Sequence, residues 1–230
     1  MNRTLPALAI TCLLFPAILQ AQVPATTDFD SSATTYFQTH ANELPVYNGR
    51  QHLGYMPTII GYAYYGIREW QTGSVLYDGH WYHGVNLKYD LVADELILQA
   101  INLTGSVMIK SRIREFYLGD THFVRSPFPA SSNRSFYQEI ANGQISLIAF
   151  HKKIIEEKTL EQEIERKFIY TIQYLAVTET GVHPVKRQKD LVKLLGDKRV
   201  AANASLKAAG FKWKENPERA MKHLVEFYNK

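Results

Sequence analysis

The residues best suited to chemistry lie within the stretch 73–98, where His80 and His83 accompany Asp78 and Asp90. Imidazole and carboxylate groups are the usual metal ligands where no thiolate is present. Residues three apart on a strand point to opposite faces, so the two histidines would not share a metal ion. Asp78 is explained by a turn, because it precedes a glycine. We therefore expect no metal site and no cofactor.

A general acid and a general base could be drawn from four side chains, but nothing in the sequence places any two of them together: Asp90, Asp94, Glu95 and His122. Acid–base catalysis needs positioned groups before their pKa values matter. The sequence contains no G-x-S-x-G, G-x-G-x-x-G, P-loop or H-E-x-x-H motif. We therefore predict no catalytic residues and favour a protein that is not an enzyme.

The strongest local signal is Asp78-Gly79, which lies between two apolar and aromatic runs and predicts a type I′ hairpin turn. A two-residue turn pairs Tyr77 with His80, Leu76 with Trp81, Val75 with Tyr82, and Ser74 with His83. Continued alternation then predicts a core face with Trp81, His83, Val85, Leu87, Tyr89 and Leu91. The wetter face would carry His80, Tyr82, Asn86, Lys88 and Asp90.

Aromatic side chains are abundant, with 14 tyrosines and 11 phenylalanines. They are typical of strands and of binding surfaces. The tyrosine-rich segment 58–67 is either a strand or an aromatic loop that closes over the sheet. From these features we predict five ligand-binding residues, which are Tyr62, Tyr64, Tyr77, His80 and Tyr82.

Residues 1–21 have the pattern of a signal peptide, with a positive start, an apolar run and a small residue, Ala21, at the end. The run is shorter than the roughly 20 residues of a membrane span. We expect cleavage before Gln22 and no transmembrane span afterwards. Cys12 is the only cysteine, so the mature chain would form no disulfide. These features predict export to the periplasm, the cell surface or the medium.

Further strands are predicted after the central stretch. Gly119-Asp120 favours a type II′ turn, and Asn142-Gly143 predicts another hairpin, in which Ile140 pairs with Ile145 and Tyr137 with Ile148. The charged segment 151–167 is either a solvated helix or the exposed end of a long hairpin. Strong strand formers flank it on both sides, which favours the hairpin.

The pattern becomes helical after residue 187. Asn216-Pro217 is a good helix start, with asparagine as the cap and proline in the first turn. This part of the chain is also the basic part. An exported protein rarely meets nucleic acid, so we expect none as a partner, and the basic groups would form a solvated face.

These observations divide the chain into a signal peptide (1–21), an N-terminal lead-in (22–56), an antiparallel β domain (57–186) and a basic C-terminal helical unit (187–230). The expected fold class is α+β and mainly antiparallel β. The strands would form a rolled or partly closed β meander, because a long run of successive strands otherwise leaves exposed edges.

Several segments together resemble uncharacterised exported proteins of Bacteroidota: YNGR, EWQTGSVLYDGHWYHGVNLKYDLVADELIL, KDLVKLLGDK and LVEFYN. The resemblance covers most of the mature chain. It implies a periplasmic or outer-surface location and a lineage, but it assigns no activity and no catalytic residues.

Three functions are compatible with the sequence. The favoured one is a non-enzymatic envelope protein that binds a protein, glycan or lipid through an aromatic side of the sheet. The second is a carrier of a small molecule or lipid, with its pocket inside the β roll. The third is a hydrolase without a recognisable motif, which would need carboxylates or histidines with shifted pKa values in a cleft.

Overall fold

The computed structural model describes residues 45–100, 102–127, 134–159 and 163–230, which belong to one compact unit. The expected signal peptide, its cleavage site and most of the lead-in lie outside these residues.

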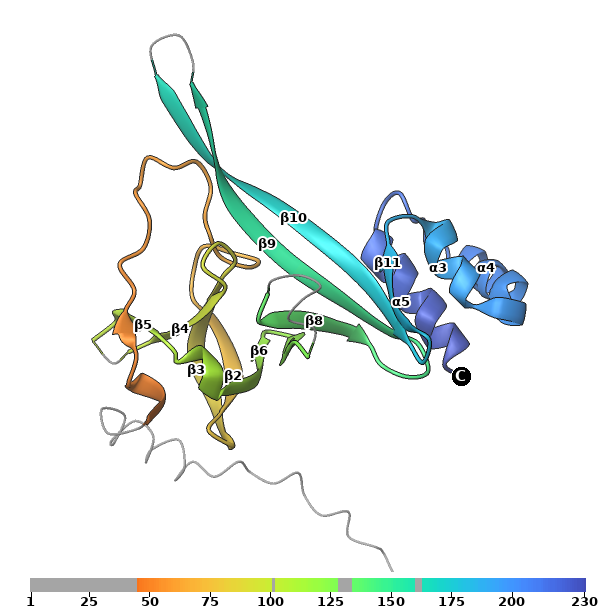
Figure 1. The fold of residues 1–230 in the computed structure, drawn as a ribbon, viewed down its shortest axis with the longest axis horizontal. Helices are drawn as coiled ribbons and strands as arrows, with labels where there is room; N and C mark the ends of the chain where they lie inside the picture. Colours follow the sequence, from red (N-terminus) through yellow and green to blue (C-terminus); the bar gives the residue numbers. More distant parts are fainter. Residues whose placement is uncertain (1–44, 101, 128–133, 160–162) are drawn as a thin grey trace, which may run out of the picture. The chain divides into compact units, whose positions relative to one another are not determined.

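Strands dominate the described part, and they form one antiparallel sheet with the order β1-β5-β4-β3-β2-β6-β7-β8-β9-β10-β11 (Figure 1). Their bounds are β1 Arg50–Gln51, β2 Gln71–Tyr77, β3 His80–Asp90, β4 Glu95–Gln99, β5 Gly105–Val107, β6 Ile113–Leu118, β7 Thr121–Arg125, β8 Phe136–Ala141, β9 Ser146–Thr159, β10 Ile164–Thr178 and β11 Gly181–Val185.

Helices gather at the C-terminal end of the chain, after the last strand. They are α3 Gln188–Leu194, α4 Arg199–Ala208 and α5 Pro217–Tyr228, with a short 3-10 turn, η4 Gly196–Lys198, between α3 and α4. Two further 3-10 turns come earlier in the chain, η2 Pro45–Tyr47 and η3 Lys110–Arg112. The expected α+β class, with a mainly antiparallel sheet and a C-terminal helical unit, is confirmed. Within the described ranges, no helix has the length and apolar character needed to cross a bilayer.

The sheet is open, since β1 and β11 form its two ends, and it is not a closed barrel. It nevertheless rolls back on itself. The Lys153 amide on β9 donates a hydrogen bond to the Leu91 carbonyl, just after β3, at 3.0 Å. Four strands lie between β3 and β9 in the sheet order. The strands from β3 to β9 therefore form a rolled segment that encloses a core.

Aromatic side chains fill this roll. Five of the largest side chains with almost no exposure come from β2, β3, β6, β7 and β8, and they are Tyr77, Tyr89, Phe116, Phe123 and Phe136. The rings of Phe116 and Phe123 stack with centroids 4.9 Å apart, and Tyr89 meets Phe116 edge-on at 5.3 Å. Such ring pairs add to the stabilisation from burial alone.

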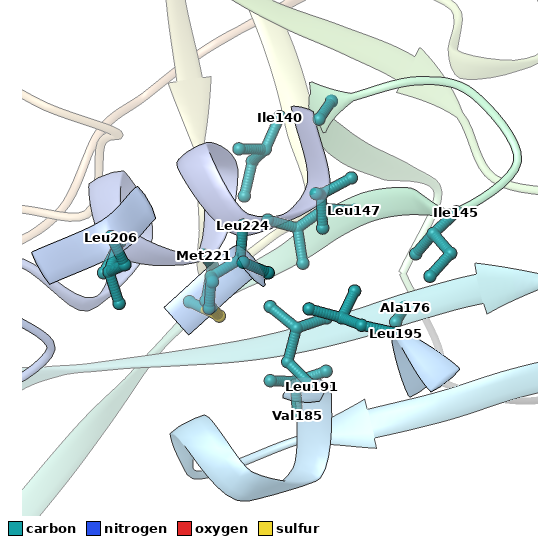
Figure 2. Close-up of a cluster of buried hydrophobic side chains, with 14 of the residues drawn as sticks. Ile140, Ile145, Leu147, Ala176, Val185, Leu191, Leu195, Leu206, Met221 and Leu224 are labelled. Atoms are coloured by element: carbon teal, nitrogen blue, oxygen red, sulfur yellow. The ribbon is translucent and has the colours of Figure 1, made fainter. Parts of the chain in front are cut away.

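A second core lies between the sheet and the helices (Figure 2). Ala149 and Ala176 are fully buried on neighbouring strands, and their small side chains let a helix approach the sheet closely. Met221 and Leu224 of α5 fill this space, and Leu191 of α3 lies in the same cluster. The sheet and the helical unit therefore share one hydrophobic core.

The helix start expected from the sequence is present. Asn216 caps α5, because its side-chain oxygen accepts the Arg219 amide at 2.9 Å, and Pro217 is the first helical residue. The cap satisfies one of the amides that a helix start leaves without a partner.

The Asp78-Gly79 hairpin is confirmed. Both residues have positive φ, 50° and 80°, and the pairs from Tyr77↔His80 to Ser74↔His83 have the predicted register. The predicted core face of β3 is confirmed at Leu87 and Tyr89 but wrong at His83 and Tyr82, because a bulge opposite Gly73 and Ser74 breaks the alternation.

Gly84, with φ 64°, is the residue on β3 at this bulge. One extra residue in a strand exchanges the faces beyond it. Tyr82 is therefore buried together with Leu87 and Tyr89, whereas His83 is exposed.

On both sides of residues 160–162, which lie outside the described ranges, β9 and β10 pair as the expected long hairpin, from Thr159↔Ile164 to Ser146↔Val177. The register predicted at Asn142-Gly143 is wrong, since Ile148 pairs with Glu139 rather than with Tyr137. The register differs because a residue far along the chain contacts this turn. Asn229, after α5, accepts the Ile145 amide and donates to the Ile145 and Asn142 carbonyls, so it holds a longer turn open.

Candidate functional site

The five predicted ligand-binding residues do not form one site. Tyr77 is fully buried and Tyr82 is 8% exposed, so both belong to the interior. His80 is exposed at the hairpin end, where its Nδ1 lies 3.0 Å from the Asp78 carbonyl. Tyr62 and Tyr64 lie elsewhere, in segment 58–67, which the sequence predicted to be either a strand or a loop.

That segment is an aromatic loop against the sheet, with two isolated bridges, Ile60↔Lys167 and Tyr64↔Asp90. Its orange trace approaches the β9–β10 pair in Figure 1. The loop borders a small pocket of about 110 Å³. We call it the tyrosine pocket; it is lined by Tyr55, Met56, Pro57, Ile59, Gly61, Tyr62, Ala63, Tyr64, Arg68 and Phe168.

A half-buried lysine and a buried carboxylate fix this loop. Lys153 donates to the carbonyls of Tyr62 and Tyr64 at 2.8 and 2.7 Å, and its ammonium lies 4.0 Å from the Tyr62 ring centroid. Burial lowers the pKa of Lys153, while Asp90 raises it. The Asp90 carboxylate is fully buried and accepts the Tyr55 hydroxyl at 2.8 Å. The loop is therefore held in place before any ligand arrives.

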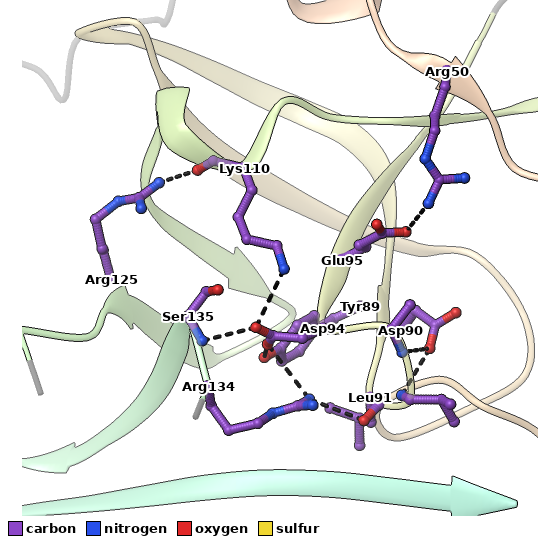
Figure 3. A network of polar contacts seen from close by, with 12 residues as sticks. Arg50, Tyr89, Asp90, Leu91, Asp94, Glu95, Lys110, Arg125, Arg134 and Ser135 are labelled. Atoms are coloured by element: carbon purple, nitrogen blue, oxygen red, sulfur yellow. Dashed lines mark hydrogen bonds and ion pairs between the residues drawn. The ribbon is translucent and has the colours of Figure 1, made fainter. Parts of the chain in front are cut away.

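Asp94 is a second buried carboxylate, and it connects three parts of the roll (Figure 3). It accepts the Tyr89 hydroxyl at 2.6 Å and the Ser135 amide at 2.8 Å. Lys110 and Arg134 lie 3.4 and 3.5 Å from its oxygens. Because these partners surround the carboxylate, we assign Asp94 a structural role.

A larger groove of about 700 Å³ lies where β11 ends beside β10 and the helices. It is mostly apolar, and its lining consists of Ile172, Gln173, Tyr174, Pro184, Val185, Lys186, Trp213, Pro217 and Met221. This volume is in the range of ligand sites in proteins.

A chain of hydrogen bonds runs from the groove along the sheet. Glu218 accepts from Tyr174 at 3.2 Å and from the Gln138 amide at 3.1 Å. The Gln138 oxygen lies 2.7 Å from His151 Nε2, and His151 Nδ1 lies 2.5 Å from the Tyr170 hydroxyl. An amide oxygen only accepts, so Nε2 carries the proton and Nδ1 accepts from Tyr170.

The protonation states in this chain follow from burial. Burial lowers the pKa of His151 to about 4, with the charge of Arg134 acting in the same direction. Burial likewise raises the pKa of Tyr170 and Tyr174, and Glu218 adds to both shifts. The imidazole and both phenols are neutral near pH 7, and every polar group in the chain has a partner. The chain orders the groove wall.

The edge of β10 next to this groove has a gap in its pairing. At one end Ile60 donates to the Arg166 carbonyl at 2.9 Å and accepts the Phe168 amide at 3.0 Å. At the other end Tyr174 pairs with Val185 of β11. In the part of the chain that the structure describes, no strand pairs with this edge of β10 over residues 169–173.

Strand parity shows which backbone groups this gap exposes. The Phe168 amide points toward this edge, so the amides and carbonyls of Tyr170 and Ile172 do as well. Strand β9 supports this assignment. Its residue Lys153, the partner of Tyr170, directs its amide away from β10 to the Leu91 carbonyl. Among the described residues, the outward groups of Tyr170 and Ile172 form no hydrogen bond.

We call residues 169–173 with their open edge the strand slot. Between Phe168 and Tyr174 it offers about 20 Å of strand, at about 3.3 Å per residue. Edge strands are often protected by lysine, proline or a bulge. The slot sequence, Ile-Tyr-Thr-Ile-Gln, contains neither lysine nor proline. The strand slot therefore lies as an open strand edge directly beside the apolar groove.

Sequence reasoning missed both the slot and the groove. The local signal at 168–177 indicated a strand, but an open edge depends on where β11 leaves β10 and where Ile60 joins it. No sequence pattern carries this information.

Comparisons of the chain with models of protein families, with curated proteins and with solved structures found no match. Within the described ranges, no group of three or more histidine, cysteine, aspartate or glutamate side chains is placed to hold a metal ion.

Proposed function

We propose that this protein is an exported binding module that takes an extended segment of another protein into the strand slot. The single observation that carries the proposal is the open edge of β10 at Tyr170 and Ile172 beside the 700 Å³ groove. Addition of a strand to an exposed sheet edge is a general mode of peptide recognition, in which main-chain hydrogen bonds give affinity and pockets give specificity.

The groove supports a preference for apolar side chains. Ile172 and Tyr174 lie two residues apart on β10, so they share a face, and both line the groove with Met221. A strand paired opposite Ile172 would direct every second side chain to this face. An apolar side chain there would enter the groove next to Trp213.

The interior of the roll supports binding at the edge over transport inside. Tyr89, Phe116 and Phe123 occupy the space in which the alternative carrier would hold its cargo. Export rests on the pattern of residues 1–21 and remains part of the proposal.

The test uses short acetylated and amidated peptides of alternating threonine and one apolar residue, with valine, leucine or phenylalanine in separate peptides. Titration into the isotopically labelled protein should shift the amide signals of Tyr170 and Ile172 downfield, because both amides gain an acceptor. Two further peptides carry N-methyl groups on alternate residues, in the two possible phases. One phase should abolish binding and the other should not, since only one edge of the peptide faces β10.

Two tryptophan variants provide a matched comparison. Trp213→Ala removes a groove wall and should weaken binding, whereas Trp81→Ala, on the β2–β3 hairpin, should leave it unchanged. Circular dichroism establishes that both variants fold. Equal binding of both N-methylated peptides, or shifts elsewhere than at β10, would exclude strand addition.

A further inference from the structure

The tyrosine pocket contains one exposed guanidinium, and the carboxylates of Asp90 and Glu69 act on its neighbours Tyr64 and Lys88. Arg68 lines the pocket and is exposed, and among the described residues it forms no ion pair or hydrogen bond. Burial and Asp90 raise the pKa of Tyr64, and burial lowers the pKa of Lys88. The charge of Arg68 acts downward on both pKa values, which places it within electrostatic reach of these two side chains. The nearby lysines are engaged: Lys88 lies over the Tyr64 and Trp70 rings, and Lys153 holds two carbonyls.

The tyrosine hydroxyls of the pocket complement Arg68. Tyr55 donates its proton to Asp90, and Tyr62 donates its proton to the Gly66 carbonyl at 2.5 Å. Burial and Asp90 raise the pKa of Tyr55, so this phenol stays protonated. Toward a ligand, the two oxygen atoms are therefore hydrogen-bond acceptors. Arg68 supplies the donors.

The walls of the pocket are rigid and aromatic. Tyr55 meets Phe168 edge-on, with centroids 5.3 Å apart. The loop carrying the tyrosines is tied to β3 by Tyr65, whose amide donates to the Tyr89 carbonyl at 2.9 Å. It is tied to β10 by Ile60. A ligand would therefore meet a site whose shape is already set, which lowers the cost of binding.

We propose that the tyrosine pocket binds one carboxylate-bearing sugar unit of an acidic saccharide. The planar guanidinium of Arg68 matches a carboxylate through two parallel hydrogen bonds. The tyrosine oxygens accept from sugar hydroxyls, and the ring faces pack against the apolar C–H groups of the sugar. The volume of about 110 Å³ is well below that of drug-sized sites, which limits the contact to a single ring.

A single free guanidinium favours a carboxylate over a phosphoryl group. A phosphoryl group carries more charge and more acceptor oxygens, and it would need a second free cation. Lys88 and Lys153 do not supply one, because both are already engaged with rings and carbonyls. This proposal is independent of the strand slot, since it uses none of the residues 169–173.

The experiment measures binding of glucuronate, glucose, acetate and inorganic phosphate to the full chain by calorimetry. Arg68→Gln removes the pocket cation, and Arg114→Gln removes another exposed arginine, on β6. We expect glucuronate to bind the wild type and Arg114→Gln equally, and Arg68→Gln about tenfold more weakly or worse. Glucose lacks the carboxylate and acetate lacks the sugar ring, so both should bind more weakly than glucuronate.

Three results would overturn the proposal. The first is the absence of glucuronate binding by folded wild-type protein. The second is equal affinity in Arg68→Gln, and the third is phosphate binding as tight as glucuronate binding. Peptide titrations of Arg68→Gln separate this proposal from the strand slot, because the variant should retain its response at Tyr170 and Ile172.

Discussion

His151 lies where the roll and the helical unit meet, 3% exposed, with Tyr170 on one ring nitrogen and Gln138 on the other. The neutral imidazole accepts a hydrogen bond from Tyr170 and donates one to Gln138. Protonation would place a charge in a buried site and turn Nδ1 from an acceptor into a donor facing the Tyr170 hydroxyl. Burial lowers the pKa of His151 in the folded protein to about 4, against about 6.5 in an unfolded chain.

This shift predicts a loss of stability in acid. Between about pH 6.5 and pH 4 the unfolded state binds the proton and the folded state does not, so the free energy of unfolding falls as pH falls. The full loss from this group is on the order of 3 kcal/mol. Melting at pH 7, 6, 5 and 4 should show a smaller decline for His151→Gln than for the wild type. His80→Gln, at an exposed histidine, should follow the wild type.

The bulge at Gly84 leads to a second prediction for single residues. Tyr82 is 8% exposed, and His83 is exposed on the opposite face. Tyr82→Ala should cost about 3 kcal/mol, as for other large buried side chains. His83→Ala should cost about 0.5 kcal/mol or less. Urea unfolding of both variants checks this order, and the reverse order would show that the alternation continues without a bulge.

Among the elements, β10 has the most varied surroundings. One edge pairs with β9 from Ile164 to Val177. The other edge bonds to Ile60 at one end and to β11 at the other, with no partner between them among the described residues. The amides of one strand should therefore differ in protection from hydrogen exchange. Those of Tyr170 and Ile172 face the strand slot, and that of Thr171 faces β9.

We expect the amides of Tyr170 and Ile172 to exchange much faster than that of Thr171, although the three are neighbours. The Thr171 amide is protected by its ladder bond to Lys152, whereas the other two have no acceptor among the described residues. Exchange followed by nuclear magnetic resonance, without ligand, measures the three rates. Equal protection of all three amides would show that the slot is already occupied in the free protein.

At the scale of the molecule, a side chain that follows the last helix bonds to the β8–β9 turn of the sheet. Asn229 bonds to the amide and carbonyl of Ile145 and to the carbonyl of Asn142, at 3.0 to 3.3 Å. Gly143 packs against it so closely that a Cβ there would lie 2.3 Å from the Asn229 amide nitrogen. The C-terminal residues therefore help to shape the β8–β9 turn.

Removal of this connection should destabilise the whole unit, because the helices and the sheet share one core. Asn229→Ala leaves the Ile145 amide without its acceptor, at a cost of about 1–3 kcal/mol. Glu226→Gln, on the exposed side of α5, is the matched control and should change stability little. A single unfolding transition, shifted only in Asn229→Ala, is the expected result. Separate transitions for helices and sheet would contradict the shared core.

The sequence by itself determined the features that depend on neighbouring residues. Asp78-Gly79 predicted a hairpin and its register, because positive φ at both positions is a local property. Asn216-Pro217 predicted the start of α5 for the same kind of reason. The antiparallel class and the long hairpin over 151–167 also followed, since strand formers and turn residues act over short distances.

Tertiary structure decided everything that depends on which strands become neighbours. The bulge at Gly84 buried Tyr82 in place of His83, and Asn229 changed the turn after β8. Tyr62 and Tyr64 line the same pocket, whereas Tyr77 and Tyr82 are buried in the interior. The strand slot is the clearest case. Among the described residues, this edge is unpaired because β11 ends at Val185 and Ile60 joins further along, and long-range pairing of this kind leaves no local signal in the sequence.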